Sequence, residues 1–262
     1  MFIKKDTYGV GTGRLRKLRV LSAIIVGCCV LFINTAGVAA NGSVHTESEK
    51  KPEPIAEGEV SAALLAEVGT GRVVYEYNSE EKLPAAGLTR LAALVSVCKG
   101  FDEGWLKPGD AVSVSEKAAG IGGTTAFLKA GEQMDAETML LAAVMINAGD
   151  ATHSLALAAA GSESAAVQEI NACMAGIGVE TNFSEICGAG EKLSASELAK
   201  IGAALTASES YRKFGTKFYE KIEHNTGAGA TELANPNKLV KQYSGCIGVG
   251  TGSSTEAGYC GV

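Results

Sequence analysis

Residues 82–100, KLPAAGLTRLAALVSVCKG, have the layout of an active site that presents a nucleophile. They form a short loop with a proline that leads into a buried helix. The first turn of such a helix has free backbone N–H groups, and its dipole favours developing negative charge. Where a serine or cysteine nucleophile could stand, the sequence has Gly87, and one turn later on the same face it has Arg90. Glycine has no side-chain oxygen to acylate, and arginine stays protonated at physiological pH. This stretch therefore has the layout of a reactive site without its reactive groups.

The sequence from Val60 onward predicts one globular domain of about 200 residues, long enough for a substantial core. Apolar runs on both sides of EVGTGR predict a β-hairpin centred on Gly69 and Gly71. A buried helix is predicted from Leu88 to about Lys99, with Gly100 at its C-cap. These elements would carry the loop and the first turn described above.

Further elements are predicted from apolar periodicity and capping residues. DAVSVSEKAAG predicts a short strand followed by a polar loop. Helices are predicted in DAETMLLAAVMINAG, DATHSLALAAAG, SESAAVQEINACMAGIG and SASELAKIGAALTAS, the last with Ser194 or Ser196 as its N-cap. Two strands, GCIGVGTG and AGYCGV, close the chain around SSTE. Strands at both ends of a helical block predict a layered α+β domain.

Residues 1–40 have the layout of a secretory signal. Six Lys and Arg residues precede VLSAIIVGCCVLFI, an apolar run that is short for a membrane-spanning helix. GVAAN then offers small residues for cleavage after Ala39 or Ala40. An uncleaved signal-anchor is the open alternative, and either segment would place the rest of the chain outside the cytoplasm. Residues 41–59 are charged, rich in Pro and Glu and without periodicity, so a disordered linker is predicted there.

Composition argues against several partner classes. Without residues 1–40 the chain keeps 17 basic and 28 acidic side chains, a formal charge of −11. Such a surface argues against nucleic acid or anionic lipid as the main partner, and leaves membrane contact only to an uncleaved N-terminal segment. The sequence has no Cys-x-x-Cys pair and only three scattered histidines, so neither a metal nor a cofactor is expected.

Five cysteines follow the predicted signal. Cys98 and Cys173 lie in apolar helical patterns and are expected to be small core residues. An odd number of cysteines in an exported protein leaves at least one free thiol. A disulfide among Cys187, Cys246 and Cys260 is an open possibility.

Four blocks occur in order along the chain: residues 60–95, residues 112–161, NPNKLVKQY and GVGTGSSTEAGYC. Together they resemble the serine D-alanyl-D-alanine carboxypeptidases, the low-molecular-mass penicillin-binding proteins, over nearly everything from about Glu59 to Val262. The resemblance implies a role in peptidoglycan metabolism. It also implies a β-lactamase/DD-peptidase-like fold for residues 60–262, in which helices and a helical subdomain flank an antiparallel sheet.

The chemistry of this family uses three motifs, and the sequence departs from each. S-x-x-K supplies a serine nucleophile and its activating lysine, S-x-N assists proton transfer and substrate positioning, and the lysine of K-T-G meets the substrate carboxylate. By the resemblance, the motifs fall on Gly87 and Arg90, on Asn147, Ala148 and Gly149, and on Gly250, Thr251 and Gly252. Thr251 and Gly252 match and are the expected substrate-binding residues. The other positions leave no intact catalytic group, so the chain is expected to be a degenerate, inactive member.

The substituted positions also have purely structural interpretations. Gly87 would relieve a tight entry into the helix once no hydroxyl is needed. Arg90 would form an ion pair with Asp150 or Glu132. Asn147 would cap a helix end or hold its loop.

Three functions stay open for the exported domain. The first is a non-catalytic relative that binds peptidoglycan stem peptides or a cell-wall protein. The second is a residually active serine-type carboxypeptidase, and the third is a non-functional remnant. A relocated nucleophile is disfavoured, because Thr89 is expected to point off the cleft face and Ser253 to follow its strand.

The resemblance implies a departure at the C-terminal end as well. Members of the family continue past the strand that AGYCGV begins, adding a central strand and a terminal helix, and both are expected to be missing here. That strand would lie between the N-terminal hairpin and the K-T-G hairpin, so its absence would leave two unpaired edges. A fragment, a decaying gene copy and a strand supplied by a partner remain open explanations.

Overall fold

The computed structural model describes residues 60–188, 190–227 and 229–262. The predicted export segment, residues 1–40, and the predicted linker, residues 41–59, lie outside this range and remain predictions. Among the described residues, none of the helices has the length and apolar character needed to cross a bilayer.

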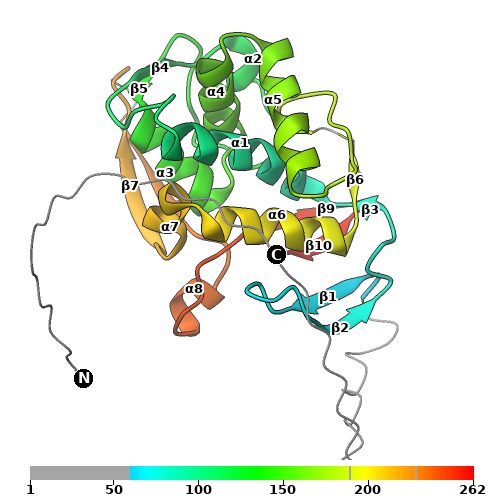
Figure 1. Ribbon diagram of the computed structural model, residues 1–262. Coiled ribbons are helices and arrows are strands. Elements are labelled where there is room, and N and C mark those ends of the chain that lie inside the picture. Colours follow the sequence, from blue (N-terminus) through cyan, green and yellow to red (C-terminus); the bar gives the residue numbers. More distant parts are fainter. Residues whose placement is uncertain (1–59, 189, 228) are drawn as a thin grey trace, which may run out of the picture. The chain divides into compact units, whose positions relative to one another are not determined.

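Short helices and hairpins alternate along the described chain (Figure 1). The helical elements are the 3₁₀ turn η1 (Ala86–Thr89) and the helices α1 (Arg90–Asp102), α2 (Glu116–Ala119), α3 (Ala136–Ile146), α4 (Gly149–Ala160), α5 (Glu163–Gly176), α6 (Ala195–Ala207), α7 (Glu209–Gly215) and α8 (Leu239–Gln242). The strands are β1 (Ala63–Ala66), β2 (Val73–Tyr77), β3 (Leu83–Pro84), β4 (Ala111–Ser113), β5 (Gln133–Asp135), β6 (Lys192–Leu193), β7 (Tyr219–Glu223), β8 (Ala230–Ala234), β9 (Thr251–Ser254) and β10 (Gly258–Gly261). This mixture of helices and strands confirms the α+β class.

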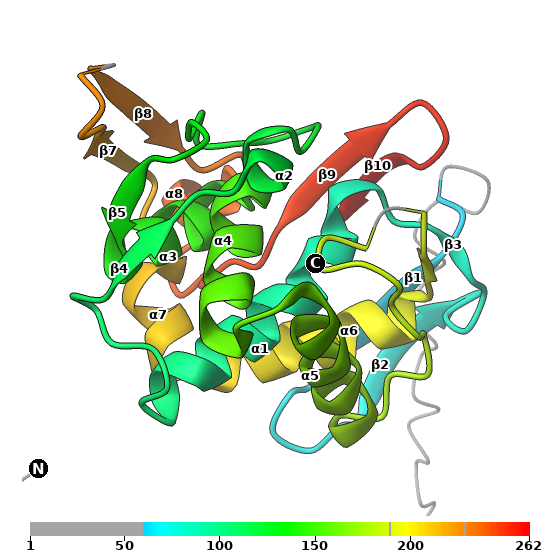
Figure 2. The same cartoon turned by 90° about the horizontal axis from the view of Figure 1, so that it is seen from above.

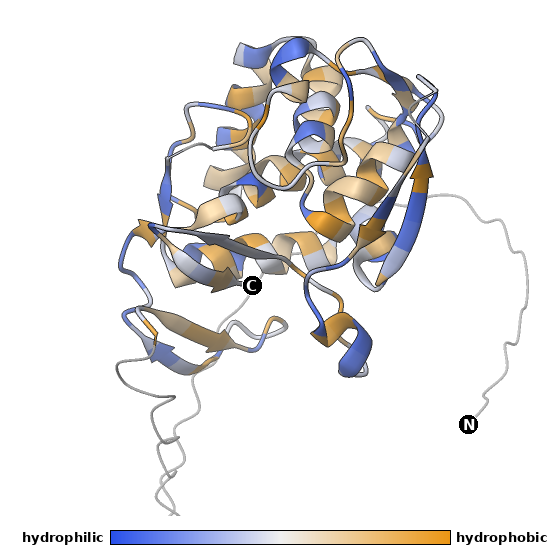
Figure 3. Cartoon of the chain, turned by 180° about the vertical axis from the view of Figure 1, so that it is seen from behind, coloured by the Kyte–Doolittle hydropathy of each residue, from blue (hydrophilic) through white to orange (hydrophobic). Residues whose placement is uncertain are grey.

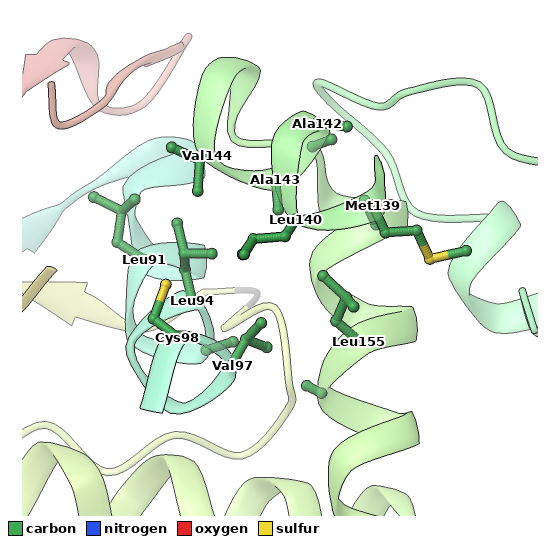
Figure 4. Close-up of a cluster of buried hydrophobic side chains, with 14 of the residues drawn as sticks. Leu91, Leu94, Val97, Cys98, Met139, Leu140, Ala142, Ala143, Val144 and Leu155 are labelled. Atoms are coloured by element: carbon green, nitrogen blue, oxygen red, sulfur yellow. The ribbon is translucent and has the colours of Figure 1, made fainter. Parts of the chain in front are cut away.

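Helix α1 lies at the centre of the helical block and contacts α4, α5, α6 and α7 (Figure 2). Its sequence is apolar on almost every side, which is typical of a helix that is buried all round. Leu91 and Leu94 of α1 face Leu140 and Val144 of α3 in the core close-up (Figure 4). Full burial of one such side chain contributes about 1.5–3 kcal/mol to stability. These contacts fix the position of the helix whose first residue is Arg90.

Each strand of the described chain pairs antiparallel with one partner, giving the two-stranded sheets β1–β2, β3–β6, β4–β5, β7–β8 and β9–β10. No ladder of the described residues joins β1–β2 to β9–β10. The expected antiparallel pairing is therefore present as separate pairs rather than as one continuous sheet. Helix α6 packs against β1, while β9 and β10 pack against η1. Apolar residues gather on the helices, whereas β7 is largely hydrophilic (Figure 3).

The predicted N-terminal hairpin is confirmed, and the predicted first helix is confirmed with a different end. The hairpin turn contains Gly71 at φ +71°, a conformation that glycine adopts without steric cost. Helix α1 continues past Gly100 to Asp102, so the predicted C-cap at Gly100 is wrong. The chain turns instead at Gly104, where φ is +81°.

Two other segments differ from the sequence predictions. The residues after β4 form the helical turn α2 rather than a polar loop, because Ser115 caps the turn by accepting a hydrogen bond from the backbone N–H of Ala118. The strand predicted in GCIGVGTG begins only at Thr251, since Gly245 and Gly248 take positive φ angles that break an extended run. The hairpin β7–β8 and helix α7 were not predicted, and the sequence YEKIE of β7 has too little apolar alternation to indicate a strand.

The cysteines of the described residues are all free thiols. Cys98 and Cys173 are buried in the helical core, which confirms their predicted role. Burial raises the pKa of Cys98 to about 12 and that of Cys173 to about 11. The disulfide considered among Cys187, Cys246 and Cys260 does not form.

A buried carboxylate joins the loop before η1 to the start of α6. Ser194 is the N-cap of α6 and forms a capping box with Glu197, which is 4% exposed. The Glu197 carboxylate accepts hydrogen bonds from the backbone N–H groups of Ser194 (3.1 Å) and Thr181 (3.0 Å) and from Lys82 Nζ. Burial acts to raise the pKa of Glu197, but the hydrogen bonds from Lys82 and the backbone lower it overall. Because Lys82 directly precedes β3, this network helps to place the turn that carries Gly87.

Replacing the buried carboxylate is expected to change both stability and its pH dependence. Because the pKa of Glu197 is lower in the folded state, its contribution is present above the unfolded pKa of about 4.3 and is lost as pH falls through the folded pKa. Glu197→Gln is therefore expected to cost about 1–3 kcal/mol near neutral pH. It should also flatten the loss of stability between roughly pH 5 and pH 3.

Thermal denaturation followed by circular dichroism measures both effects. Glu80→Gln is the matched control, because Glu80 is exposed and this change should leave the curve unaltered. Equal melting curves for Glu197→Gln and wild type at neutral pH and in acid would contradict the role assigned to this carboxylate.

Candidate active site

Gly87 lies in the 3₁₀ turn η1, which three neighbouring elements hold in place. Strand β3 pairs with β6 just before the turn, α1 follows directly after it, and β9 packs against it. The preceding residue, Ala86, has φ +49°, a left-handed conformation that costs alanine about 1–2 kcal/mol. The surrounding contacts must hold this conformation. The predicted nucleophile position thus lies at the N-terminal end of the buried helix.

Asn147 contacts Gly87 from the C-terminal end of α3. It is the C-cap of that helix, with φ +54° and ψ +45°, a left-handed conformation that asparagine tolerates better than most residues. Its Nδ2 donates a 2.7 Å hydrogen bond to the carbonyl oxygen of Gly87. The residue is only 6% exposed, and its Oδ1 is buried without a hydrogen-bond partner among the described residues. Asn147 therefore caps a helix, as one interpretation predicted, and keeps one unused acceptor.

Arg90 is the first residue of α1 and is only 9% exposed. Its Nη1 donates hydrogen bonds to the carbonyl oxygens of Thr124 (2.9 Å) and Asn147 (3.3 Å). Its Nη2 donates to the carbonyl oxygen of Gly122. The guanidinium therefore binds two segments that are far apart in the sequence.

The ion pair considered for Arg90 is wrong, since none of the ion pairs of the described chain involves it. The Asp150 carboxylate accepts hydrogen bonds from the backbone N–H groups of Ala126 and Leu128. Glu132 lies 2.8 Å from Nδ1 of His224. Both carboxylates are thus occupied elsewhere, and Arg90 is satisfied by neutral carbonyl groups.

Two glycines leave room for the guanidinium of Arg90. A Cβ atom at Gly149, the first residue of α4, would lie 2.9 Å from Cζ of Arg90 and 2.7 Å from Cγ2 of Ile121. A Cβ atom at Gly123, where φ is +80°, would lie 2.9 Å from Nη2 of Arg90. Atoms this close repel strongly, so the guanidinium lies in space that side chains at positions 123 and 149 would need.

Strand β9 packs against η1 on its glycine face. A Cβ atom at Gly252 would lie only 3.3 Å from the backbone nitrogen of Gly87. One at Gly250 would lie 3.3 Å from Cδ2 of Leu88, so a lysine there would need that leucine to shift. Thr251 is the first residue of β9 and lies between Gly250, which precedes the strand, and Gly252, so its side chain points to the opposite face from that of Gly252.

The structure brings the predicted site positions into one cluster. Gly87 contacts Asn147 and lies close to Gly252, while Arg90 contacts Asn147 and Gly149. Two cavities of about 200 and 310 Å³ lie elsewhere, one between α1, α4 and α5 and the other between α1 and α6. None of the predicted site positions lines either cavity.

The nucleophilic side chains near this cluster lack the features of an activated group. Thr89 is 4% exposed, and its hydroxyl contacts the carbonyl oxygens of Ala86 (3.3 Å) and Cys187 (3.2 Å). Ser253 is exposed on β9. Cys187, whose proximity the sequence did not indicate, lies with its Sγ 3.6 Å from the carbonyl oxygen of Gly149. Burial raises the pKa of Cys187 to about 11, which keeps it protonated and weakly nucleophilic at neutral pH.

The sequence did not indicate the wall that residues 120–124 form beside Arg90. Besides binding Arg90, the Thr124 carbonyl oxygen accepts a hydrogen bond from the backbone N–H of Gly149 (2.9 Å). The glycine-rich run GIGG indicates a loop here, but nothing in the pattern indicates its partner.

Comparison with known proteins assigns the family. Residues 46–262 match the family model of the S11 peptidases, described as D-alanyl-D-alanine carboxypeptidase. The chain belongs to this family. It is 32% identical over 246 residues to the D-alanyl-D-alanine carboxypeptidase DacF of Bacillus subtilis, an alignment that covers 92% of this chain and 61% of the relative.

Solved structures share the fold at lower identity. The D-alanyl-D-alanine carboxypeptidase DacD of Francisella tularensis matches with a TM-score of 0.70 and 20% identity, over 79% of this chain and 62% of its own. An evolved putative penicillin-binding protein homologue from Mycobacterium tuberculosis matches with a TM-score of 0.69 and 18% identity, over 79% and 78% of the two chains. These matches confirm the DD-peptidase-like fold. The chain spans about three fifths of the length of the first two relatives.

The contact between Asn147 and Gly87 leads to a graded stability prediction. Asn147→Ala removes the hydrogen bond and forces alanine into a left-handed conformation, at a combined cost of about 2 kcal/mol. Asn147→Gly removes the same bond but adopts the conformation freely, so it should cost about half as much. Urea denaturation of both variants measures the difference, and equal losses would contradict the conformational part of this account.

Proposed function

We propose that this chain is an exported, non-catalytic member of its family that binds a peptidoglycan stem peptide along β9, beside Gly87. The observation that carries the proposal is the pairing of Gly87, which lacks a nucleophilic atom, with an Arg90 guanidinium engaged by three carbonyl groups. An acyl-enzyme needs a side-chain nucleophile, and its activation needs a neutral base. Neither group is present at these positions.

The groups that remain are suited to holding a peptide. Strand β9 pairs with β10 along one edge, and its second edge pairs with no other strand of the described residues. An extended peptide can add to such an edge through backbone hydrogen bonds. The side chain of Asn147 donates to the carbonyl oxygen of Gly87 and so holds the turn η1 in place beside this edge.

The charged groups near Gly87 leave backbone hydrogen bonds as the main source of affinity in this proposal. With glycine at position 250, the motif lysine that would attract a terminal carboxylate is missing. Arg90 does not replace it, because its guanidinium is buried and bound to carbonyl groups. Binding should therefore depend little on ionic strength, unlike binding through exposed charges.

The proposal predicts binding without turnover. A peptide that ends in D-alanyl-D-alanine should give a saturable signal in isothermal titration calorimetry, with no release of D-alanine. A fluorescent β-lactam should leave no covalent label after denaturation. Gly87→Ser combined with Arg90→Lys should restore little activity, since Asn147, Gly149 and Gly250 remain substituted.

A matched pair of glycine variants locates the binding site. Gly87→Leu should abolish binding. A Cβ atom at Gly87 would have only Asn147 Nδ2 within 4 Å, at 3.7 Å, so a leucine fits there and blocks the peptide beside β9. Gly69→Leu, in the β1–β2 turn with nothing within 4 Å of its Cβ, should bind as wild type does. D-alanine release or a covalent label would instead support a residually active carboxypeptidase. Absence of both binding and turnover would support a non-functional remnant.

Export is part of the proposal, because peptidoglycan lies outside the cytoplasm. It rests on the basic and apolar runs of residues 1–40. A fusion of residues 1–60 to a reporter that is active only outside the cytoplasm should be active in a bacterial host. A fusion that lacks residues 1–19 is the control and should be silent, because it has lost the basic run. A silent full-length fusion would rule out export by this segment.

A further inference from the structure

We propose that Arg90 is a positioning residue whose guanidinium occupies the space that a side chain at Gly149 would need. From there it holds Asn147 and the wall of residues 120–124 in the arrangement that binds a ligand. This inference rests on the proposed function for the identity of the ligand. Its structural part, the coupling of Arg90 to Gly149, can be tested without any ligand.

The shape of the guanidinium suits it to bind carbonyl groups on two segments. Its planar fork donates to the carbonyl oxygens of Gly122 and Thr124 on one segment and of Asn147 on another. The ammonium group of a lysine has one nitrogen on a flexible stem, so it cannot reach three carbonyl oxygens in this spread geometry. Arginine at position 90 therefore has a structural role that lysine at the same position would not perform.

The space around the guanidinium is limited by two glycines. The guanidinium lies against both Gly123 and Gly149, and a Cβ atom at either residue would come within 2.9 Å of it. Glycine at position 149 therefore leaves the space that the Arg90 guanidinium occupies, and a side chain there would meet both Arg90 and Ile121. On this proposal the residues at positions 90 and 149 are coupled rather than independent.

Arg90 also fixes the position of Asn147, which contacts Gly87. Arg90 binds the backbone carbonyl of Asn147, while the Asn147 side chain binds the carbonyl of Gly87. Both the backbone carbonyl and the side-chain Nδ2 of Asn147 are thus hydrogen-bonded, which fixes the orientation of the whole residue and of its buried Oδ1. The nucleophile position itself carries no such constraint, because a Cβ atom at Gly87 would be in ordinary contact at 3.7 Å.

A double-mutant cycle tests the coupling. Gly149→Asn alone should lower the melting temperature by roughly 5 °C through overpacking. Arg90→Lys alone should lower it by a similar amount, because buried carbonyl groups lose their donors. In the double variant the two losses should not add, since lysine vacates the space that asparagine needs. Strictly additive losses would overturn the inference.

Ile121 is the necessary comparison, because its Cγ2 would also meet a side chain at position 149. The same cycle with Ile121→Ala measures the share of the clash that belongs to Ile121. Full rescue of Gly149→Asn by Ile121→Ala, with none by Arg90→Lys, would assign the clash to Ile121 and overturn the coupling.

Ligand binding provides the readout that a purely structural role would not change. At a temperature where the variant is fully folded, Arg90→Lys should weaken binding of the D-alanyl-D-alanine peptide by about tenfold. Arg72→Lys is the matched control, because Arg72 is exposed on the β1–β2 hairpin and should affect neither affinity nor stability. Unchanged affinity in Arg90→Lys would overturn the positioning role. If wild type binds no peptide, the proposed function fails, and the stability cycle alone decides whether Arg90 and Gly149 are coupled.

Discussion

The burial of α1 among four other helices is the constraint on which the rest of the structure depends. Its apolar surface can be removed from water only if α4, α5, α6 and α7 surround it, and their positions are set by that packing. The same packing leaves its first turn next to η1 and β9. Every position of the candidate site is therefore located relative to the start of one buried helix.

Buried polar groups around α1 are satisfied mainly by the backbone rather than by opposite charges. Arg90 donates to carbonyl groups, while Asp150 and Glu197 accept from backbone N–H groups, with Lys82 as an additional partner of Glu197. A buried charge without such partners would cost several kcal/mol. These bonds connect segments that are far apart in the sequence, so they help to fix the arrangement of the candidate site.

The positions of the candidate site differ in whether they have room for a side chain. A serine at Gly87 would fit the space that is present, whereas a side chain at Gly149 would collide with Arg90 and Ile121. The guanidinium of Arg90 occupies the space beside Gly149 and binds the carbonyl oxygens of residues 122, 124 and 147. The arrangement around position 90 is therefore held by an arginine, whereas position 87 has room for a side chain.

The sequence alone determined the α+β class, the hairpin with Gly71, most helices and the family, because hydrophobic periodicity, caps and ordered motifs are local signals. It also predicts that Gly87 and Arg90 stand where the family has its reactive residues. The carbonyl partners of Arg90 and the lack of space for a side chain at Gly149 could not be predicted, since both depend on distances between segments that are remote in the chain. The polar strand β7 and the end of α1 beyond Gly100 were missed because tertiary packing overrides weak local preference. Only the tertiary structure decided that Arg90 binds carbonyl groups, because folding buries its guanidinium against the backbone of residues 122–124 and 147.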